Sequence, residues 1–249
     1  MAKILSVVNQ KGGVGKTTTA ISVAHNLVLR GRQVLLVDLD PQGQCATSLA
    51  VNPEACVFNV LVNPRSDIHQ WIRDTGRPGL DLLPGDRSTA TAQIVINAEN
   101  RPLDAIRLIF RAIGREYDYI IFDTAPSVGG IQERAIFASD LVLVPTATEY
   151  LSIDGLAQML ELLTTLREKS WNGQMIGILP TFYDEQTSES SKSLQELQEN
   201  FKDAILPPIH RATILRECTA EGKTIFEFSP ASRASREYEE LGRLVVRRS

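Results

Sequence analysis

Eight residues near the amino terminus have the types and the spacing to bind phosphate. They directly follow the apolar run at residues 4–8 and are Lys11, Gly12, Gly13, Val14, Gly15, Lys16, Thr17 and Thr18. Glycines lack a Cβ, so successive backbone N–H groups can converge on an anion. Lys16 then supplies a positive charge for the β- and γ-phosphates, and the Thr17 hydroxyl is placed to coordinate Mg²⁺. The stretch therefore predicts a site for the phosphates of a nucleotide.

Three aspartates follow two further apolar runs. Asp38 and Asp40 come after residues 33–37, and Asp123 comes after residues 119–122. Because the carboxyl ends of parallel strands meet at one edge of an open α/β sheet, we expect these carboxylates beside the phosphate loop. An aspartate there can hold the shell of Mg²⁺, through water or through the threonine of the loop. Asp38 and Asp40 could instead cap the following helix, and that alternative stays open.

Apolar runs and helical periodicities alternate along the chain. Buried strands are expected at residues 4–8, 33–37, 80–83, 119–122, 141–145, 175–179 and 205–206. Helices are expected from the phosphate loop to Gly31, at residues 89–98, 103–113, 150–167 and 191–201, and from residues 229–230 onward. Continuous apolar strands alternating with helices are typical of a parallel sheet covered on both faces. We predict a three-layer α/β/α fold with a central, mostly parallel twisted sheet, and one domain over residues 1–249.

The composition is that of an ordinary globular protein, with 43% hydrophobic and 22% charged residues. No apolar run approaches a membrane span and the start has no signal-peptide architecture, so we expect a cytoplasmic location. Cys45, Cys56 and Cys218 lack the spacing of zinc or disulfide motifs and are interpreted as small buried hydrophobes. The net charge is −4, so a polyanion would have to bind to a local basic patch.

The phosphate loop departs from the common pattern. Gln10 stands where that pattern has glycine, and an extra lysine, Lys11, precedes the glycine pair. The string KGGVGKTTT resembles the deviant Walker A box of the ParA/MinD ATPases. Together with DLDPQG, DTAPS, the segment at residues 149–156 and YEEL at residues 238–241, it makes the chain similar to the ParA/Soj-type partition ATPases over nearly its whole length. This resemblance implies a P-loop NTPase fold.

The resemblance also implies roles for the residues of the site. Lys11 corresponds to a signature lysine that reaches the partner's phosphates, so ATP would be sandwiched in a homodimer. The implied catalytic residues are Lys11, Lys16 and Asp40, with Asp40 orienting the attacking water. The implied ligands are residues 11–18 and Asp123 for ATP, Thr17, Asp38 and Asp123 for Mg²⁺, and Pro180, Thr181, Pro208 and Ile209 for the adenine. Phosphoryl transfer needs charge neutralisation more than covalent help, which makes a lysine supplied by a partner reasonable.

ParA-type proteins bind DNA without sequence preference in the ATP-bound dimer. The arginines expected to do so here are Arg211, Arg216, Arg233 and Arg236. Gln186 and Ile214 depart from the family, because arginine is often found at these positions, and each arginine could also belong to a solvated helix face. The implied function is segregation of chromosome or plasmid DNA by ATP hydrolysis, in association with the nucleoid. A ParB-like or other adaptor that stimulates hydrolysis is the implied protein partner.

Alternatives come from the same superfamily. Positioning of a protein cargo or organelle on the nucleoid by the same mechanism stays open. A MinD-like membrane switch would need a terminal amphipathic helix with bulky apolar residues, and residues 244–249 are too short for it, so no membrane partner is expected. An iron–sulfur reductase would need cysteines near the middle of the chain, and none lies between Cys56 and Cys218.

Overall fold

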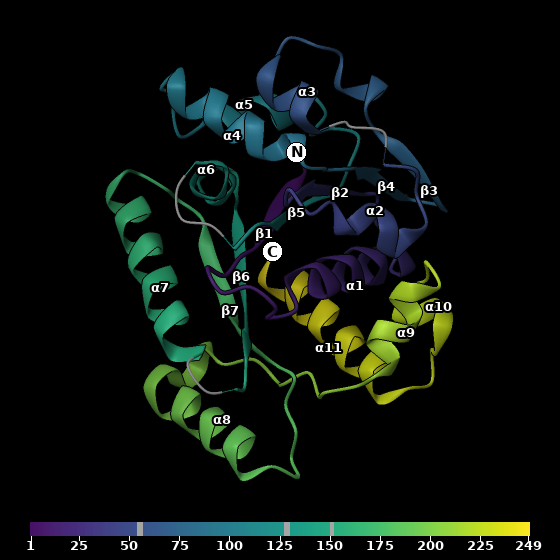
Figure 1. Ribbon diagram of the computed structural model, residues 1–249, viewed down its shortest axis with the longest axis vertical. Helices are drawn as coiled ribbons and strands as arrows, with labels where there is room; N and C mark the ends of the chain where they lie inside the picture. Colours follow the sequence, from purple (N-terminus) through teal and green to yellow (C-terminus); the bar gives the residue numbers. More distant parts are fainter. Residues whose placement is uncertain (54–56, 127–129, 150–151) are drawn as a thin grey trace.

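A seven-stranded sheet forms the centre of the protein (Figure 1). The computed structural model describes the chain except residues 54–56, 127–129 and 150–151. The strands are β1 (Lys3–Val7), β2 (Val34–Leu39), β3 (Arg73–Arg77), β4 (Leu80–Leu83), β5 (Tyr119–Thr124), β6 (Leu141–Ala147) and β7 (Gln174–Thr181). Their order is β3-β4-β2-β5-β1-β6-β7, and every pair is parallel except β3 with β4. The predicted mostly parallel sheet is confirmed.

Helices cover both faces of this sheet (Figure 1). One face carries α1 (Lys16–Leu29), α2 (Gln44–Leu49), α9 (Ile214–Ala220), α10 (Ile225–Phe228) and α11 (Arg233–Arg248). The other carries α3 (Val57–Val62), α4 (Ser88–Ala98), α5 (Ala105–Arg111), α6 (Ile131–Ala138), α7 (Ser152–Glu168) and α8 (Ser188–Phe201). Two short 3₁₀ turns, η1 (Ile68–Gln70) and η2 (Lys202–Ala204), lie in the connections. The predicted three-layer α/β/α arrangement is therefore confirmed.

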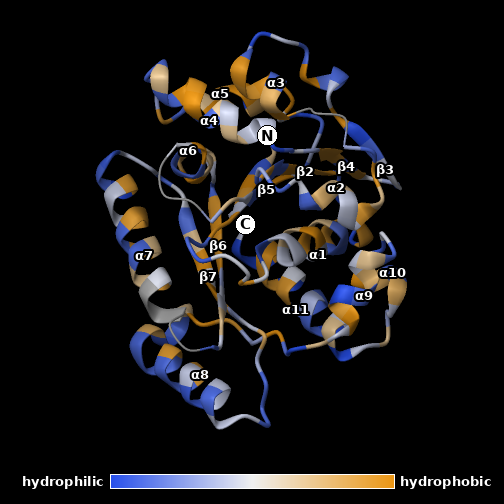
Figure 2. Cartoon of the chain, in the orientation of Figure 1, coloured by the Kyte–Doolittle hydropathy of each residue, from blue (hydrophilic) through white to orange (hydrophobic). Residues whose placement is uncertain are grey.

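Alternate residues of each central strand enter opposite cores. In β2, Val34 and Leu36 pack toward α1, whereas Leu35 and Val37 pack toward the side of α3 to α5. Every residue of β2 is buried, which explains why its sequence is a continuous apolar run rather than an alternating one. In Figure 2 the central strands are mostly orange, whereas the helices mix orange with blue, as expected for elements with one buried and one exposed face.

Helix α11 packs directly on α1. Its Tyr238, Leu241 and Val245 are at most 2% exposed. A Cβ added at Gly242 would lie 1.9 Å from Asn26 Oδ1 in α1, so only glycine allows this close approach. The apolar residues of the last helix are thus core residues, as the sequence predicts.

Two predicted elements need correction. Helix α11 begins at Arg233 rather than at residues 229–230, because the Ser232 hydroxyl accepts the N–H of Ser235 at 3.2 Å and caps the helix. Ile205 and the residue after it form no strand but one isolated bridge to Ile178. Two prolines follow that bridge and have no N–H to extend it.

The helix predicted at residues 150–167 is observed as α7, which begins at Ser152. Its predicted first residue, Tyr150, lies outside the described residues, as do Cys56 and Ser127 of the DTAPS motif. Within the described part of the chain, no helix combines the length and the apolar character that a membrane crossing requires.

Candidate nucleotide and magnesium site

The phosphate loop connects β1 to α1 at the carboxyl edge of the sheet. Gly13 and Gly15 have φ angles of 74° and 84°, in the left-handed region that side chains with a Cβ seldom adopt. Gly15 occupies the N-cap position of α1, and its carbonyl accepts the N–H of Thr19 at 2.9 Å. Gly12 and Gly13 are exposed, so the backbone of the loop is accessible to a ligand there. The side chain of Val14 is buried and holds the loop against the protein.

Two side-chain hydrogen bonds tie the loop to β6 and β7. The buried Asn9 donates to the carbonyl of Pro145 at 2.7 Å and accepts the N–H of Lys11 at 2.9 Å. The hydroxyl of Thr181, at the end of β7, donates to the carbonyl of Val14 at 3.0 Å. Asn9 was missed in the sequence, where its signal is a single amide between an apolar strand and the glycine-rich stretch.

The two lysines of the loop occupy different environments. Lys16 is 6% exposed, and its Nζ donates to the carbonyl of Lys11 at 3.0 Å. Burial lowers the pKa of Lys16, and the carboxylates of Asp123 and Asp40 oppose that effect. Lys11 itself is partly exposed at the surface of the loop. The loop therefore holds one buried cation beside the carboxylates and a second one nearer the solvent.

Asp38 and Asp123 face each other at the ends of two paired strands. They are direct partners in the register of β2 and β5, and both are at most 1% exposed. Burial, with the nearby charge of Asp123, raises the pKa of Asp38 to about 8. Burial also raises the pKa of Asp123 to about 6, against the opposing effects of the Thr17 hydroxyl and the Lys16 charge. Two carboxylates that are both shielded from water favour the binding of a cation.

The capping alternative holds in part for Asp38. Its two oxygens accept the N–H groups of Asp40 and of Cys45, the latter in the first turn of α2, each at 3.0 Å. Asp40 is partly exposed, and its Oδ1 accepts the N–H of Gln42 at 2.9 Å. It also lines a cavity of about 330 Å³ together with the phosphate loop, Lys16 and other residues. Asp40 is therefore the aspartate that faces space for a ligand.

A second cavity, of about 210 Å³, adjoins the phosphate loop at Gly15 and Thr18. Of the four residues predicted for the adenine, Thr181 and Ile209 line it. Pro180 does not line this cavity, and Pro208 lines a separate groove beside α11. Other residues that line it include Phe182, which the sequence did not indicate, and Arg211 and Arg216, which were predicted to contact DNA.

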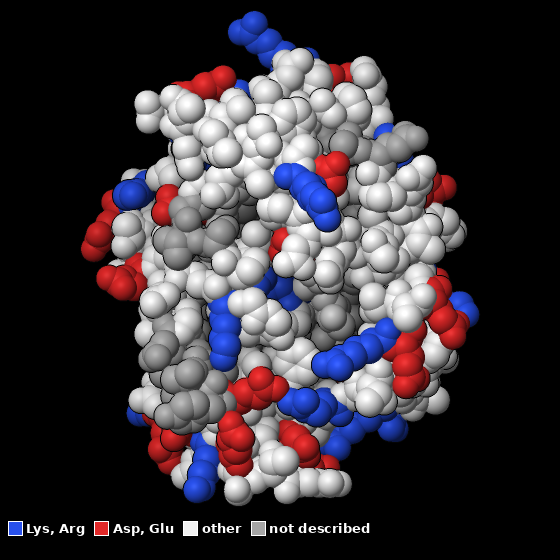
Figure 3. Space-filling view, in the orientation of Figure 1, with Lys and Arg blue, Asp and Glu red and all other residues white. Residues whose placement is uncertain are grey.

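The four predicted DNA-binding arginines differ in their partners. Arg211 bonds to Glu149 and lies over the ring of Phe182, 5.8 Å from its centroid. Arg233 pairs with two carboxylates, at 2.9 and 3.1 Å. Arg216 and Arg236 are exposed and form no ion pair within the described residues. Figure 3 shows acidic and basic side chains interspersed around the lower half of the molecule, rather than one large basic patch.

The residues present fit a magnesium–nucleotide complex. Asp123 Oδ1 is buried and has no hydrogen-bond partner within the described residues, so it can accept from a water of the ion's shell. The ammonium of Lys16 and the exposed N–H groups of the loop supply the donors that phosphate oxygens require. Hard oxygen ligands from a carboxylate and a threonine match the preference of Mg²⁺. Fold and site together define a P-loop nucleotide-binding protein.

Comparisons with known proteins identify the family. A family model described as AAA domain matches residues 2–176. The chain is 34% identical to the sporulation initiation inhibitor protein Soj of Bacillus subtilis over 99% of both chains. It is 33% identical to the chromosome partitioning protein ParA of Myxococcus xanthus, over 100% of this chain and 89% of that protein. The chain therefore belongs to the ParA/MinD family of P-loop ATPases, and the resemblance stated from the motifs is confirmed.

Solved structures show the same fold. Cyanothece McdA superposes with a TM-score of 0.89 at 21% identity, covering 98% of this chain and 100% of that one. Cobyrinic acid a,c-diamide synthase from Mycobacterium smegmatis, with bound ATP analogue and magnesium, has a TM-score of 0.85 at 28% identity and covers 99% and 95%. Pyrococcus furiosus MinD has a TM-score of 0.82 at 21% identity, with both chains fully covered.

Gly85 is a further residue of the site that the sequence did not reveal. It follows β4, and a Cβ added there would lie 2.5 Å from the carbonyl oxygen of Asp38 and 3.2 Å from that of Asp40. Both neighbours are backbone atoms, which cannot rotate away as a side chain can. A glycine at position 85 thus lets the segment that carries both carboxylates lie against the end of β4.

We predict that Gly85→Ala displaces this segment. The overpacking should lower the free energy of unfolding by about 1–3 kcal/mol, measured by urea denaturation, and should weaken binding of magnesium–nucleotide. Gly114→Ala is the matched control, because a Cβ there would lie 3.5 Å or more from its neighbours. Equal effects of the two substitutions would contradict a specific role for Gly85.

Proposed function

We propose that this chain is a partition ATPase that dimerises around ATP, binds DNA without sequence preference in that state, and hydrolyses ATP. The observation that carries the proposal is the pair of lysines on one phosphate loop, with Asp38, Asp40 and Asp123 at the adjacent strand ends. The identity to Soj and ParA over nearly the whole chain supports segregation of chromosome or plasmid DNA as the process. Mg²⁺ and ATP are the cofactors that the site fits.

In this proposal each residue has one task. Lys16 and the loop N–H groups neutralise the phosphates, and Thr17, Asp123 and Asp38 hold and support the magnesium shell. When bound, Mg²⁺ screens the charge that develops on the phosphate oxygens. Asp40, which is partly exposed and faces the cavity, orients the attacking water. Lys11 acts on the phosphates of the partner subunit.

The proposed DNA contacts rest on dimerisation. Arg211 and Arg233 have carboxylate partners, so a single subunit offers a partly neutralised surface. Non-specific affinity for DNA depends on the number of phosphates neutralised and falls steeply with salt. A dimer presents every exposed arginine twice, so two weak surfaces become one adequate site.

The position of α11 favours DNA over a membrane as the surface that is bound. A membrane-binding helix must offer its apolar face to lipid. The apolar residues of α11, among them Tyr238, Leu241 and Val245, are instead buried against α1 and the sheet. Exposing them would remove part of the protein's own core.

We predict that ATP with Mg²⁺ converts wild-type protein into a stable dimer, whereas Lys11→Ala remains monomeric with ATP. The reason is that Lys11 is proposed to supply its charge to the phosphates of the partner subunit. Static light scattering with and without ATP measures the change.

Lys16→Ala should lose nucleotide binding itself, measured with a fluorescent ATP analogue, so the two lysines give different defects. Dimerisation of Lys11→Ala as in wild type would show that this lysine has no role across the interface.

We predict that Asp40→Ala binds ATP and dimerises but hydrolyses it slowly. Loss of the carboxylate that orients water should reduce turnover by about 10²-fold or more. Phosphate release measures the rate, and light scattering measures the trapped dimer. Asp74→Ala, on the edge strand β3, is the control and should keep wild-type turnover. Wild-type turnover of Asp40→Ala would place the catalytic carboxylate elsewhere.

We predict that Arg211→Glu combined with Arg216→Glu abolishes ATP-dependent DNA binding while dimerisation survives. Wild-type affinity should fall with salt, and each DNA phosphate that the dimer neutralises should add about 0.9 to the steepness of the plot of log affinity against log salt. Mobility shifts on unrelated DNA sequences, with and without ATP, measure the binding.

The matched control is Arg111→Glu combined with Arg115→Glu, which makes the same charge change on exposed residues near the amino end of β5. Sedimentation with anionic liposomes is measured beside it. Equal loss in both double variants would indicate a net-charge effect rather than a site. Binding to liposomes that requires residues 244–248 would support the membrane alternative instead.

A further inference from the structure

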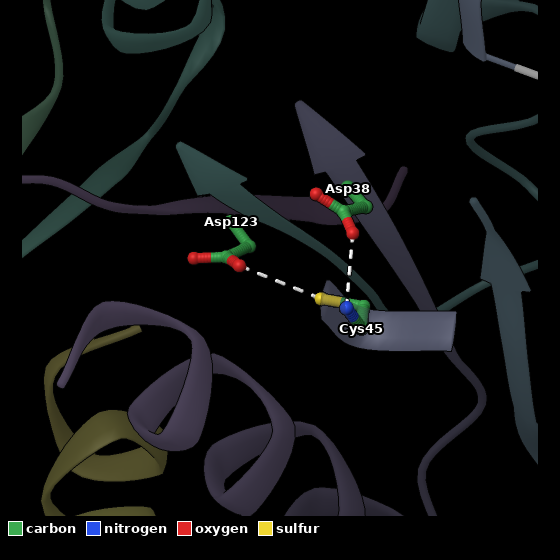
Figure 4. A group of neighbouring side chains, drawn as sticks. All are labelled: Asp38, Cys45 and Asp123. Atoms are coloured by element: carbon green, nitrogen blue, oxygen red, sulfur yellow. Dashed lines mark hydrogen bonds between the residues drawn. The ribbon is translucent and has the colours of Figure 1, made fainter. Parts of the chain in front are cut away.

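Three chain segments bring a thiol between two carboxylates beneath the phosphate loop. Asp38 lies at the end of β2, Cys45 in the first turn of α2 and Asp123 at the end of β5 (Figure 4). One ligand atom from each residue lies within 4.8 Å of the others, and all three side chains are at most 1% exposed. The cysteine spacing in the sequence gives no sign of this group, because each ligand comes from a different segment.

The distances suit a tetrahedral metal ion with mixed ligands. Zinc bonds to sulfur at about 2.3 Å and to carboxylate oxygen at about 2.1 Å, so the two atoms stand about 3.6 Å apart in a tetrahedral site. The observed distance from Cys45 Sγ to Asp123 Oδ2 is 3.5 Å. The nearest oxygen of Asp38 completes three protein ligands after a small movement, and water can take the fourth position.

The electrostatics of the group also call for a cation. Asp38 and Asp123 are buried side by side in register, where both carboxyls can be ionised together only with a counter-ion close by. Asp123 Oδ1 is buried and has no hydrogen-bond partner within the described residues. Within the described residues, the Cys45 thiol and the Thr17 hydroxyl bond to Asp123, backbone N–H groups bond to Asp38, and the ammonium of Lys16 supplies one positive charge nearby. A divalent ion would add positive charge to a group in which one ammonium faces two carboxylates and a thiol.

We propose that Asp38, Cys45 and Asp123 form a site for a thiophilic divalent cation, with zinc as its biological representative, in the nucleotide-free protein. A soft thiolate selects zinc over magnesium and calcium, which prefer oxygen ligands. Binding replaces the S–H bond of Cys45 by a sulfur–metal bond, and the proton leaves to solvent without any oxidation or reduction.

The ion has an effect on the proposed ATPase because Asp123 serves both sites. Thr17 and Gln44 line the phosphate cavity next to this group, so the ion can reach it from there. Zinc beside Oδ2 and magnesium beside Oδ1 would share one carboxylate, and the repulsion between two divalent ions so close together makes zinc and magnesium–ATP exclude each other. This exclusion rests on the proposed function, whereas zinc binding by the nucleotide-free chain does not.

The test is a titration of the full-length, nucleotide-free protein with Co²⁺, a spectroscopic substitute for zinc. We expect a thiolate-to-cobalt charge-transfer absorption in wild type that zinc removes by displacement. Cys45→Ser keeps the size of the side chain and loses the soft ligand, so it should show no such band and bind zinc at least about tenfold more weakly. Cys218→Ser and Cys56→Ser are the matched controls and should keep the band.

X-ray absorption of zinc-loaded wild type tests the ligand set without a variant. We expect one sulfur neighbour at about 2.3 Å and oxygen neighbours otherwise. A wild-type protein without the band, a band that survives Cys45→Ser, or a zinc shell without sulfur would overturn the site. A cobalt band that saturating magnesium–ATP leaves unchanged would overturn the exclusion, provided that ATP binding is measured in the same sample.

Discussion

The burial of two carboxylates at the ends of β2 and β5, next to one buried ammonium, is the constraint on which the site depends. The register of these strands places Asp38 against Asp123, and the buried ammonium of Lys16 lies close enough for Asp123 to oppose the effect of burial on its pKa. Such a group is costly without partners, so the surrounding structure supplies them. Asn9 and Thr181 hold the loop that carries Lys16, and backbone N–H groups hold Asp38.

The same constraint explains the contacts around the carboxylates. The segment after β2 must turn back sharply so that Asp38 can accept from Asp40 and Cys45. That turn comes so close to the end of β4 that residue 85 has no room for a Cβ. Glycine is therefore needed at this position because the segment with the two carboxylates passes close to it. The pairing of β4 does not need it, since β4 ends at Leu83.

Much of the fold could be predicted from the sequence because its signals are local. The runs that became β1, β2, β5 and β6 are mostly apolar, and the glycines of the phosphate loop directly follow the first of them. Edge strand β3, with the sequence RDTGR, has no such run and was not predicted. The placement of Asp38, Asp40 and Asp123 near the loop followed from strand order alone, while their chemical roles stay predictions.

Contacts between distant segments could not be predicted in this way. Nothing near Cys45 in the sequence indicates that its thiol meets Asp123, 78 residues later. Arg211 pairs with Glu149, which lies 62 residues earlier in the chain. The sequence therefore could not show that a carboxylate already neutralises part of the charge of this arginine. Pro208, which was predicted beside the adenine, lines a groove beside α11 and not the cavity next to the phosphate loop, and its role stays a prediction.

The hydrogen bond from Lys16 to the carbonyl of Lys11 makes the two lysines mechanically dependent. An ammonium has three donors, so Lys16 can keep this bond and still offer two donors to phosphate oxygens. The bond ties the backbone of Lys11 to the ammonium that is proposed to hold the nucleotide. The side chain proposed to reach the second subunit therefore starts from a position that Lys16 helps to determine.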